Sequence, residues 1–266
     1  MADTGSSTAD PMCLKEPNRT PRCHNRRVVH SDDLSLAHWL ADLATAVALP
    51  IFESGTSHSL KADGSMVTEA DIEVERQLCA ALVEKRPDDG ILSEEGSQRV
   101  GERRRWILDP IDGTSYFAAG DPRWGTNIAL EESGEIVLGI ITRPLQDMRW
   151  WAKRGEGAFE SVSGHADVAL KVSSIDTRSE ARVMVWPDRS PLVEALDRLL
   201  HGEMEAAIVS GGGPWDYAPY VVLVEEAGGR FHDPTGGRRL DLGGGIYTNG
   251  RIDAELEVIL ADLSTS

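Results

Sequence analysis

The sequence predicts a layered α+β fold in which helices cover the faces of β-sheets. Three observations support this fold class: two helical patterns come first, several strands then follow one another directly, and the last third alternates strand and helix. Consecutive strands without helices between them indicate an antiparallel meander. With 266 residues, the chain has room for one large domain or two packed subdomains.

The chain divides by composition into an arm and a globular part. Residues 1–30 are rich in Ser, Thr, Pro, Asn and Arg and poor in large apolar side chains, so we expect a disordered arm. We expect residues 31–160 to form an N-terminal α+β subdomain and residues 161–266 to form a C-terminal α/β subdomain.

Four segments have the apolar spacing and end signals of helices. The first begins near Asp32, a good N-cap residue, and loosens at Pro50, and the second follows the capping residue Thr68. The expected helices cover residues 32–50, 69–85, 191–201 and 215–227.

Strands are expected where β-branched and aromatic residues cluster between turn signals. A Ser133-Gly134 turn joins the expected strands at residues 126–131 and 135–143 into a hairpin. The expected strands cover residues 91–93, 105–108, 126–131, 135–143, 148–152, 158–159, 181–186, 205–210, 230–232 and 245–248.

The formal net charge of −17 limits the classes of partner. Nucleic acid and anionic membranes are bound by clustered Lys and Arg, so we expect neither as a partner. A protein this acidic would need cations to handle a phosphate, which is a first indication of bound metal. The three cysteines form no disulfide framework, and no signal peptide or membrane-length apolar run is recognisable, so a cytoplasmic location is expected.

Four acidic side chains lie where regular elements end or begin. Glu94 and Asp109 follow predicted strands, Asp112 precedes a turn or helix, and Asp216 opens a helix. Such positions often carry chemistry, because the scaffold is rigid there and the tip is open. Mg²⁺ prefers oxygen ligands and keeps several waters, so one or two carboxylates per ion are enough.

The segment Asp109-Pro110-Ile111-Asp112-Gly113-Thr114 joins two carboxylates to a phosphate-binding pattern. Pro110 fixes the backbone between the carboxylates, and Gly113 permits close backbone approach. An ordinary acidic turn would explain Asp-Pro-x-Asp alone. An EF-hand is excluded, because Leu108 and Pro110 would occupy ligand positions. The complete pattern would arise by chance on the order of once in ten thousand chains of this length.

Four motifs follow one another along the chain: Lys61 to Asp71, Gly90 to Glu95, Asp109 to Thr114, and Trp215-Asp216 with Glu226 to Gly229. Together they resemble the inositol monophosphatase superfamily, the lithium-sensitive, Mg²⁺-dependent phosphatases. The order and spacing hold from about Asp32 to Gly250. The resemblance implies an αβαβα sandwich of the inositol monophosphatase and fructose-1,6-bisphosphatase type, with a shortened C-terminal half.

The resemblance also implies a metal site. Two Mg²⁺ ions would be bound by four carboxylates and a main-chain carbonyl, those of Glu94, Asp109, Asp112, Asp216 and Ile111. Asp71 would hold a third, weaker ion or its water. Most of these ligands belong to the N-terminal subdomain, and Asp216 comes from the C-terminal one.

The same resemblance implies roles around the phosphate. Gly113, Thr114 and Lys61 would lie at the phosphate. A metal-bound water, oriented by Glu94, Thr114 or Asp71, would attack phosphorus in line.

The substrate class follows less directly. Residues 149–159 and the sequence around Trp215 are most similar to actinobacterial histidinol-phosphate phosphatases, so histidinol phosphate is the first expectation. Inositol, sugar or nucleotide monophosphates stay open as alternatives, and these include intermediates of specialised metabolism. Family members usually dimerise, so the resemblance implies a homodimer.

The chain departs from the family pattern just before Trp215. Relatives usually carry a further helix and strand there, and an acidic residue seven positions before the aspartate of the Trp-Asp motif, where this chain has Val209. The missing segment normally lines the leaving-group pocket. Three interpretations remain: an open pocket for a larger metabolite, a wall supplied by a partner subunit, or a catalytically inactive homologue that acts as a binding protein. Retention of every metal-site carboxylate favours an enzyme.

Overall fold

The computed structural model describes residues 32–101, 103–163, 165–177, 179–186 and 192–253. The expected N-terminal arm lies outside these residues. These described residues belong to a single compact unit by their contacts. The division near residue 160 stays a prediction.

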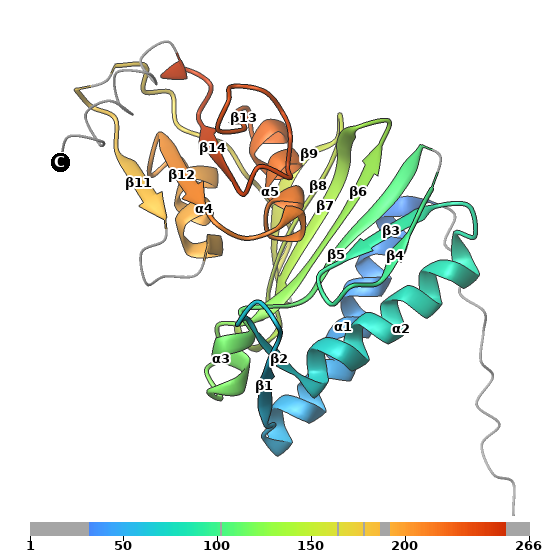
Figure 1. Cartoon of the computed structure of the whole chain (residues 1–266). Coiled ribbons are helices and arrows are strands. Elements are labelled where there is room, and N and C mark those ends of the chain that lie inside the picture. Colours follow the sequence, from blue (N-terminus) through green and yellow to red (C-terminus); the bar gives the residue numbers. More distant parts are fainter. Residues whose placement is uncertain (1–31, 102, 164, 178, 187–191, 254–266) are drawn as a thin grey trace, which may run out of the picture. The chain divides into compact units, whose positions relative to one another are not determined.

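An eight-stranded sheet forms the centre of this unit (Figure 1). Its strand order is β10-β9-β8-β7-β6-β5-β3-β4, and β3 and β5 are parallel whereas the other neighbours are antiparallel. The strands are β3 (Gly90–Ser93), β4 (Gln98–Arg99), β5 (Arg104–Asp112), β6 (Gly125–Glu132), β7 (Glu135–Arg143), β8 (Met148–Lys153), β9 (Gly157–Val162) and β10 (Val168–Ala169). The expected meander is therefore confirmed.

Helices α1 (Asp33–Ser54) and α2 (Glu69–Lys85) cover one face of the large sheet (Figure 1). A hairpin of β1 (His58–Leu60) and β2 (Met66–Thr68) connects them, and its Thr68 caps α2 as expected. Apolar side chains of both helices, such as Leu40 and Leu78, are fully buried with those of the sheet.

A second layer pair covers the other face. Helix α5 (Pro214–Glu226), with α4 (Leu192–Leu200) beside it, packs between the large sheet and a four-stranded sheet of order β11-β12-β14-β13. These strands are β11 (Val183–Trp186), β12 (Ala206–Ser210), β13 (Arg230–His232) and β14 (Gly244–Thr248). Within the described residues the layers thus run α, β, α, β, which agrees with the expected layered sandwich.

Several details differ from the sequence-based expectation. Helix α1 does not end at Pro50 but continues through it to Ser54, because a proline close to a helix end removes only one hydrogen bond of the last turns. Strand β5 does not end at Asp109 but continues to Asp112 through an irregularity in its pairing with β6. The β1–β2 hairpin and the short strands β4 and β10 were not expected. Their few residues lack the alternation by which strands are recognised in sequence. Among the described residues there are also two short helical elements, the helix α3 (Thr114–Ala118) and the 3₁₀ turn η1 (Pro144–Gln146).

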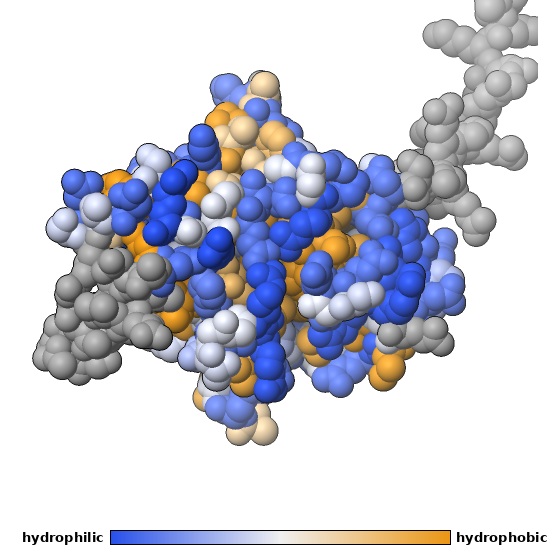
Figure 2. Space-filling model, turned by 90° about the horizontal axis from the view of Figure 1, so that it is seen from above, coloured by the Kyte–Doolittle hydropathy of each residue, from blue (hydrophilic) through white to orange (hydrophobic). Residues whose placement is uncertain are grey.

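Helix α1 is the described helix that is long and apolar enough to span a membrane by length and composition. Its buried face, with Leu36 and Leu40 fully covered, is the face of a core helix packed on a sheet. The face in Figure 2 is mainly hydrophilic, with separate apolar spots between the polar residues.

Replacing Asp32 with alanine should lower the free energy of unfolding by about 1 kcal/mol. The Asp32 carboxylate accepts a 2.8 Å hydrogen bond from the main-chain N–H of Ser35, which satisfies one of the free donors of α1. Urea denaturation would measure the loss. Asp88→Ala, in an exposed turn, is the control; equal values for the two variants would contradict the capping role.

Candidate active site

The ends of β3 and β5 bring Glu94 and Asp109 together. The two strands are parallel neighbours, with Ser93 opposite Leu108. The main-chain N–H of Glu94 donates to the Leu108 carbonyl at 3.2 Å, which places Glu94 directly beside the next residue of β5. The Glu94 carboxyl group lies close enough to act electrostatically on that of Asp109.

Asp112 and Asp216 complete an acidic cluster with Asp109. One carboxylate oxygen from each of the three lies within 4.8 Å of the others. Asp112 reaches the cluster because the pairing of β5 is irregular between Asp109 and Asp112. Asp216 reaches it from the first turn of α5, where its carboxylate also accepts a 2.6 Å hydrogen bond from the N–H of Gly213. The structure thus unites the four carboxylates that the sequence singled out.

Asp71 and Thr114 form a second part of the site. The Asp71 carboxylate is buried, accepts hydrogen bonds from Thr68 at the start of α2, and accepts a 2.9 Å bond from the Thr114 hydroxyl. That hydroxyl also lies 3.2 Å from the Ile111 carbonyl oxygen. Gly113 is the N-cap residue of α3, so its backbone and Thr114 stand at the turn between β5 and that helix.

Lys61 lies at the edge of the cluster, after β1. Its ammonium group is 3.0 Å from a Glu94 oxygen and 2.7 Å from a Glu95 oxygen. Burial raises the pKa of Glu95 to about 7, although Lys61 opposes the shift. Lys61 therefore lies beside the cluster through its contact with Glu94, and Asp71 lies beside it through its hydrogen bond with Thr114.

Burial makes the cluster electrostatically unfavourable without a cation. It raises the pKa of Asp109 well above its ordinary value, and the neighbouring carboxylates Glu94, Asp112 and Asp216 add to the shift. Burial and Asp112 also raise the pKa of Asp216 to about 7. Such shifts mark a place where several negative charges are held close together in a poorly solvated volume.

The donor set fits a hard divalent cation. One oxygen of Asp109, Oδ1, is buried and has no hydrogen-bond partner among the described residues. A buried acceptor without a donor is costly. Together with Asp112 and Asp216, Asp109 supplies three carboxylates, the oxygen ligands that Mg²⁺ takes. Glu94, on the neighbouring strand end, offers a fourth.

Comparison with known protein families finds a match over more than half of the chain. A model of the inositol monophosphatase family matches residues 35–192. The chain belongs to the inositol monophosphatase family. Members of this family are metal-dependent phosphatases, and the chain is a phosphoric monoester hydrolase of this kind.

Individual relatives are similar to this chain over nearly their whole length. A Mycobacterium tuberculosis histidinol-phosphatase is 34% identical over 85% of this chain and 96% of its own. A Streptomyces griseus protein named glucose-1-phosphate thymidylyltransferase is 41% identical over 88% of this chain and 98% of its own. The structure of a Thermotoga maritima IMPase superposes with a TM-score of 0.72 at 25% identity, over 87% of this chain and 98% of that one.

Two residues of the site were missed by sequence reasoning. Glu75, one turn after Asp71 on α2, accepts hydrogen bonds from Ser93 and from the main-chain N–H groups of Glu95 and Ser97, and so fixes the loop that carries Glu94. Arg143, at the end of β7, donates a 2.6 Å hydrogen bond to Asp112. The helical spacing from Asp71 could have indicated Glu75, whereas no local pattern indicates Arg143.

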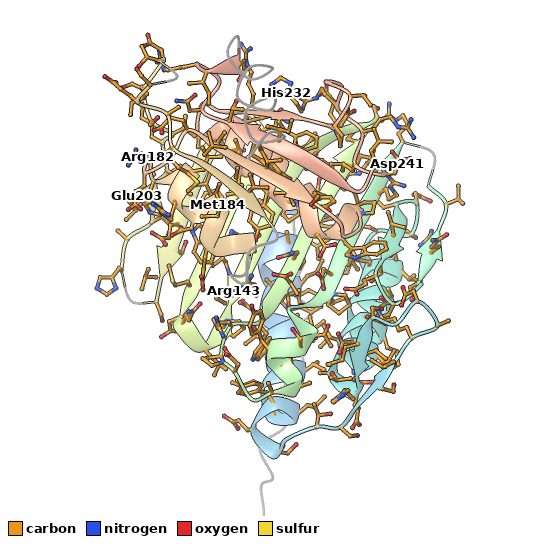
Figure 3. The ribbon with its side chains drawn as sticks, turned by 60° about the vertical axis from the view of Figure 1, so that its left-hand side comes forward. Arg143, Arg182, Met184, Glu203, His232 and Asp241 are labelled. Atoms are coloured by element: carbon orange, nitrogen blue, oxygen red, sulfur yellow. The ribbon has the colours of Figure 1, made fainter. Side chains whose placement is uncertain are left out.

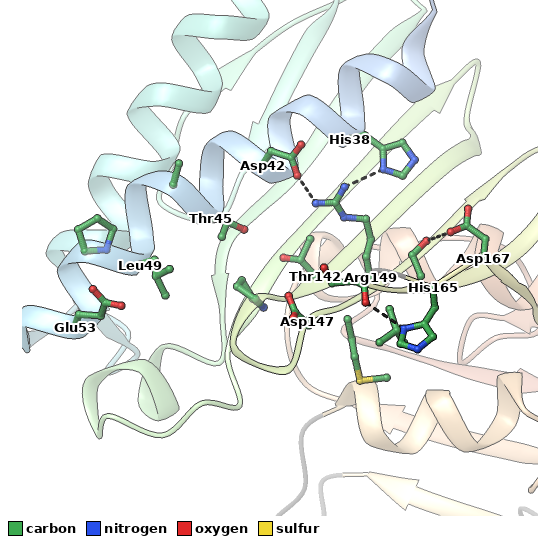
Figure 4. Close-up of a pocket in the computed structure, with 17 residues that line it drawn as sticks. His38, Asp42, Thr45, Leu49, Glu53, Thr142, Asp147, Arg149, His165 and Asp167 are labelled. Atoms are coloured by element: carbon green, nitrogen blue, oxygen red, sulfur yellow. Dashed lines mark hydrogen bonds and ion pairs between the residues drawn. The ribbon is translucent and has the colours of Figure 1, made fainter.

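A cavity lies elsewhere in the described part of the chain. It measures about 800 Å³ and opens between α1 and the ends of β8 and β9 (Figure 4). Arg149 crosses it with hydrogen bonds to Asp42 and His38. None of the four clustered carboxylates, those of Glu94, Asp109, Asp112 and Asp216, lines this cavity, so it is separate from the cluster.

Proposed function

We propose that this chain hydrolyses phosphomonoesters of small metabolites with Mg²⁺ held by Glu94, Asp109, Asp112, Asp216 and the Ile111 carbonyl. The buried acidic cluster, with an unpartnered oxygen on Asp109, is the observation that carries the proposal. We expect two ions, with Asp71 serving a third, weaker one or its water. When bound, the ions would acidify a water, neutralise the phosphoryl group and stabilise the leaving alkoxide.

The chain's own residues would hold and orient the reacting groups. Asp71 fixes the direction of the Thr114 hydroxyl through their 2.9 Å hydrogen bond. The Thr114 oxygen could therefore accept a hydrogen bond from a water, and take up the water's proton while its own proton passes to the Asp71 carboxylate. Glu94 stands beside this pair and is a second candidate for that role. Lys61 and the backbone of Gly113 would contact the phosphate.

Histidinol phosphate is our first choice of substrate. The support is the similarity to named histidinol-phosphatases, at 34% and 32% identity. Named inositol-1-monophosphatases are similar at 33% and 31%, so inositol phosphates remain alternatives, as do sugar and nucleotide monophosphates. We further propose a cytoplasmic homodimer.

The leaving-group side distinguishes this chain within its family. Only Gly211, Gly212 and Gly213 connect β12 to α5, and Val209 stands where relatives place an acidic contact to the substrate alcohol. We infer an open pocket that accepts a bulkier alcohol, or one that a partner subunit completes.

Release of inorganic phosphate tests the proposal. The purified chain would be assayed with histidinol phosphate, inositol 1-phosphate, glucose 1-phosphate and a nucleoside monophosphate, each with Mg²⁺ and with EDTA. Mg²⁺-dependent release from at least one compound is expected, together with inhibition by millimolar Li⁺. Absence of Mg²⁺-dependent release from every compound would contradict the proposed substrate class.

Replacing Thr114 with valine should lower kcat roughly 10²-fold, as expected for a positioned proton-transfer group. Valine keeps the shape of threonine but loses the hydroxyl that donates to Asp71. Thr114→Ser keeps the hydroxyl and should stay within about tenfold of the parent. The measurement is phosphate release at saturating Mg²⁺ and substrate, and equal rates for the two variants would count against this role.

A further inference from the structure

A buried arginine stands against the acidic cluster. The side chain of Arg143, which is labelled in Figure 3, is only 1% exposed. Its Nη2 donates to Asp112 at 2.6 Å. Nη1 donates to the Thr142 carbonyl at 3.0 Å, and Nε has no hydrogen-bond partner among the described residues. Because arginine stays protonated, Arg143 places a permanent positive charge beside the carboxylates.

The fold makes room for this guanidinium. Gly125, at the start of β6, pairs with Asp112 across the sheet. A Cβ atom at position 125 would lie 1.7 Å from the Thr142 carbonyl oxygen and 2.2 Å from Nη1 of Arg143. The absence of a side chain at Gly125 therefore lets β7 and its last residue approach Asp112. The backbone around Arg143 thus holds its guanidinium in a fixed, buried place, whereas the side chain of a surface arginine is free to move.

The charges around Arg143 explain what it does to the site. Asp112 and Asp109 both act on it electrostatically, as does the buried Tyr220. A hydrogen bond to Arg143 uses one oxygen of Asp112, and a carboxylate has a second one that can bind a cation. A guanidinium and a divalent cation that share one carboxylate repel each other, strongly so in a poorly solvated volume.

We propose that Arg143 is a positioning residue and built-in counterion of this site, which orients Asp112 and weakens the binding of the divalent cation that Asp112 ligates. This inference rests on the proposed metal site. It implies that the cluster contains two classes of cation-binding site, which bind the same cation with unequal affinity. It also implies that the guanidinium balances part of the negative charge when metal is absent.

Binding of Mn²⁺ tests the inference without reference to activity. Metal-stripped full-length protein would be titrated with Mn²⁺, and free Mn²⁺ followed by electron paramagnetic resonance. The parent should show two classes of site that differ at least about tenfold in Kd, the weaker of which Asp112→Asn removes. In Arg143→Gln the weaker class should tighten at least about tenfold, whereas Arg143→Lys, which keeps the charge, should stay within about threefold of the parent.

Thermal unfolding separates this role from a merely structural one. Without metal, Arg143→Gln should melt below the parent, and saturating Mn²⁺ should raise its Tm by more than it raises the parent's. An equal loss of Tm with and without Mn²⁺ would overturn the inference. Failure of Arg143→Gln to fold even in Mn²⁺ would overturn it as well, because the cation could then not replace the guanidinium charge.

The outcomes also distinguish this inference from the proposed function. If neither the parent nor Arg143→Gln binds Mn²⁺, the metal site itself is refuted. If the parent binds Mn²⁺ and Arg143→Gln binds it no more tightly, the metal site stands and the role of Arg143 falls.

Discussion

Replacing Asp109 with asparagine is expected to lower Mg²⁺-dependent phosphate release by at least roughly 10³-fold. Asp109 is buried in the cluster. One of its carboxylate oxygens lies within 4.8 Å of a carboxylate oxygen of Asp112 and of one of Asp216, and Glu94 acts on it electrostatically. Asparagine keeps the shape but removes the charge that would bind the cation. The measurement is phosphate release at saturating substrate over a range of Mg²⁺ concentrations.

Stability and a matched variant control this experiment. Because the neighbouring carboxylates already disfavour a charge at Asp109, the asparagine variant should be at least as stable as the parent in EDTA. Asp121→Asn, at a partly exposed aspartate that pairs with Arg123, should keep its rate within about threefold. An Asp109→Asn rate within about tenfold of the parent would remove Asp109 from the catalytic site.

Replacing Gly139 with valine is expected to destabilise the protein by about 3 kcal/mol and to lower the rate about 10²-fold. Gly139 lies in β7 beneath α5, and a Cβ atom there would approach the Pro219 carbonyl oxygen to 2.6 Å and a Val222 methyl group to 2.8 Å. The helix must therefore move away from the sheet. Asp216 lies on the first turn of the same helix and would move with it.

Urea denaturation and phosphate release would measure the two effects on the same samples. Glu135→Val, at the exposed start of the same strand, is the control and should change stability by less than about 0.5 kcal/mol. If Gly139→Val loses stability but keeps the parent rate, contact between α5 and β7 does not position Asp216. If it keeps both, the close packing has no energetic role.

Local patterns were sufficient for most of the fold. Helix α2 was expected over residues 69–85 and is observed over Glu69–Lys85, because its cap and apolar spacing are contained in its own residues. The hairpin of β6 and β7 was recognisable for the same reason. Strand β5 was ended too early, because its pairing beyond Asp109 depends on Gly125 of the next strand rather than on its own alternation.

The same distinction applies to the candidate site. The sequence alone determined which carboxylates to examine, since Asp109 and Asp112 stand in one short segment and Glu94 and Asp216 stand at element ends. Only the tertiary structure decided what surrounds them. Arg143 is 31 residues from Asp112 along the chain, and the antiparallel register of β5, β6 and β7 is what brings the two together. A motif encodes short-range geometry, whereas the charge balance of a buried site depends on side chains delivered by distant strands and helices.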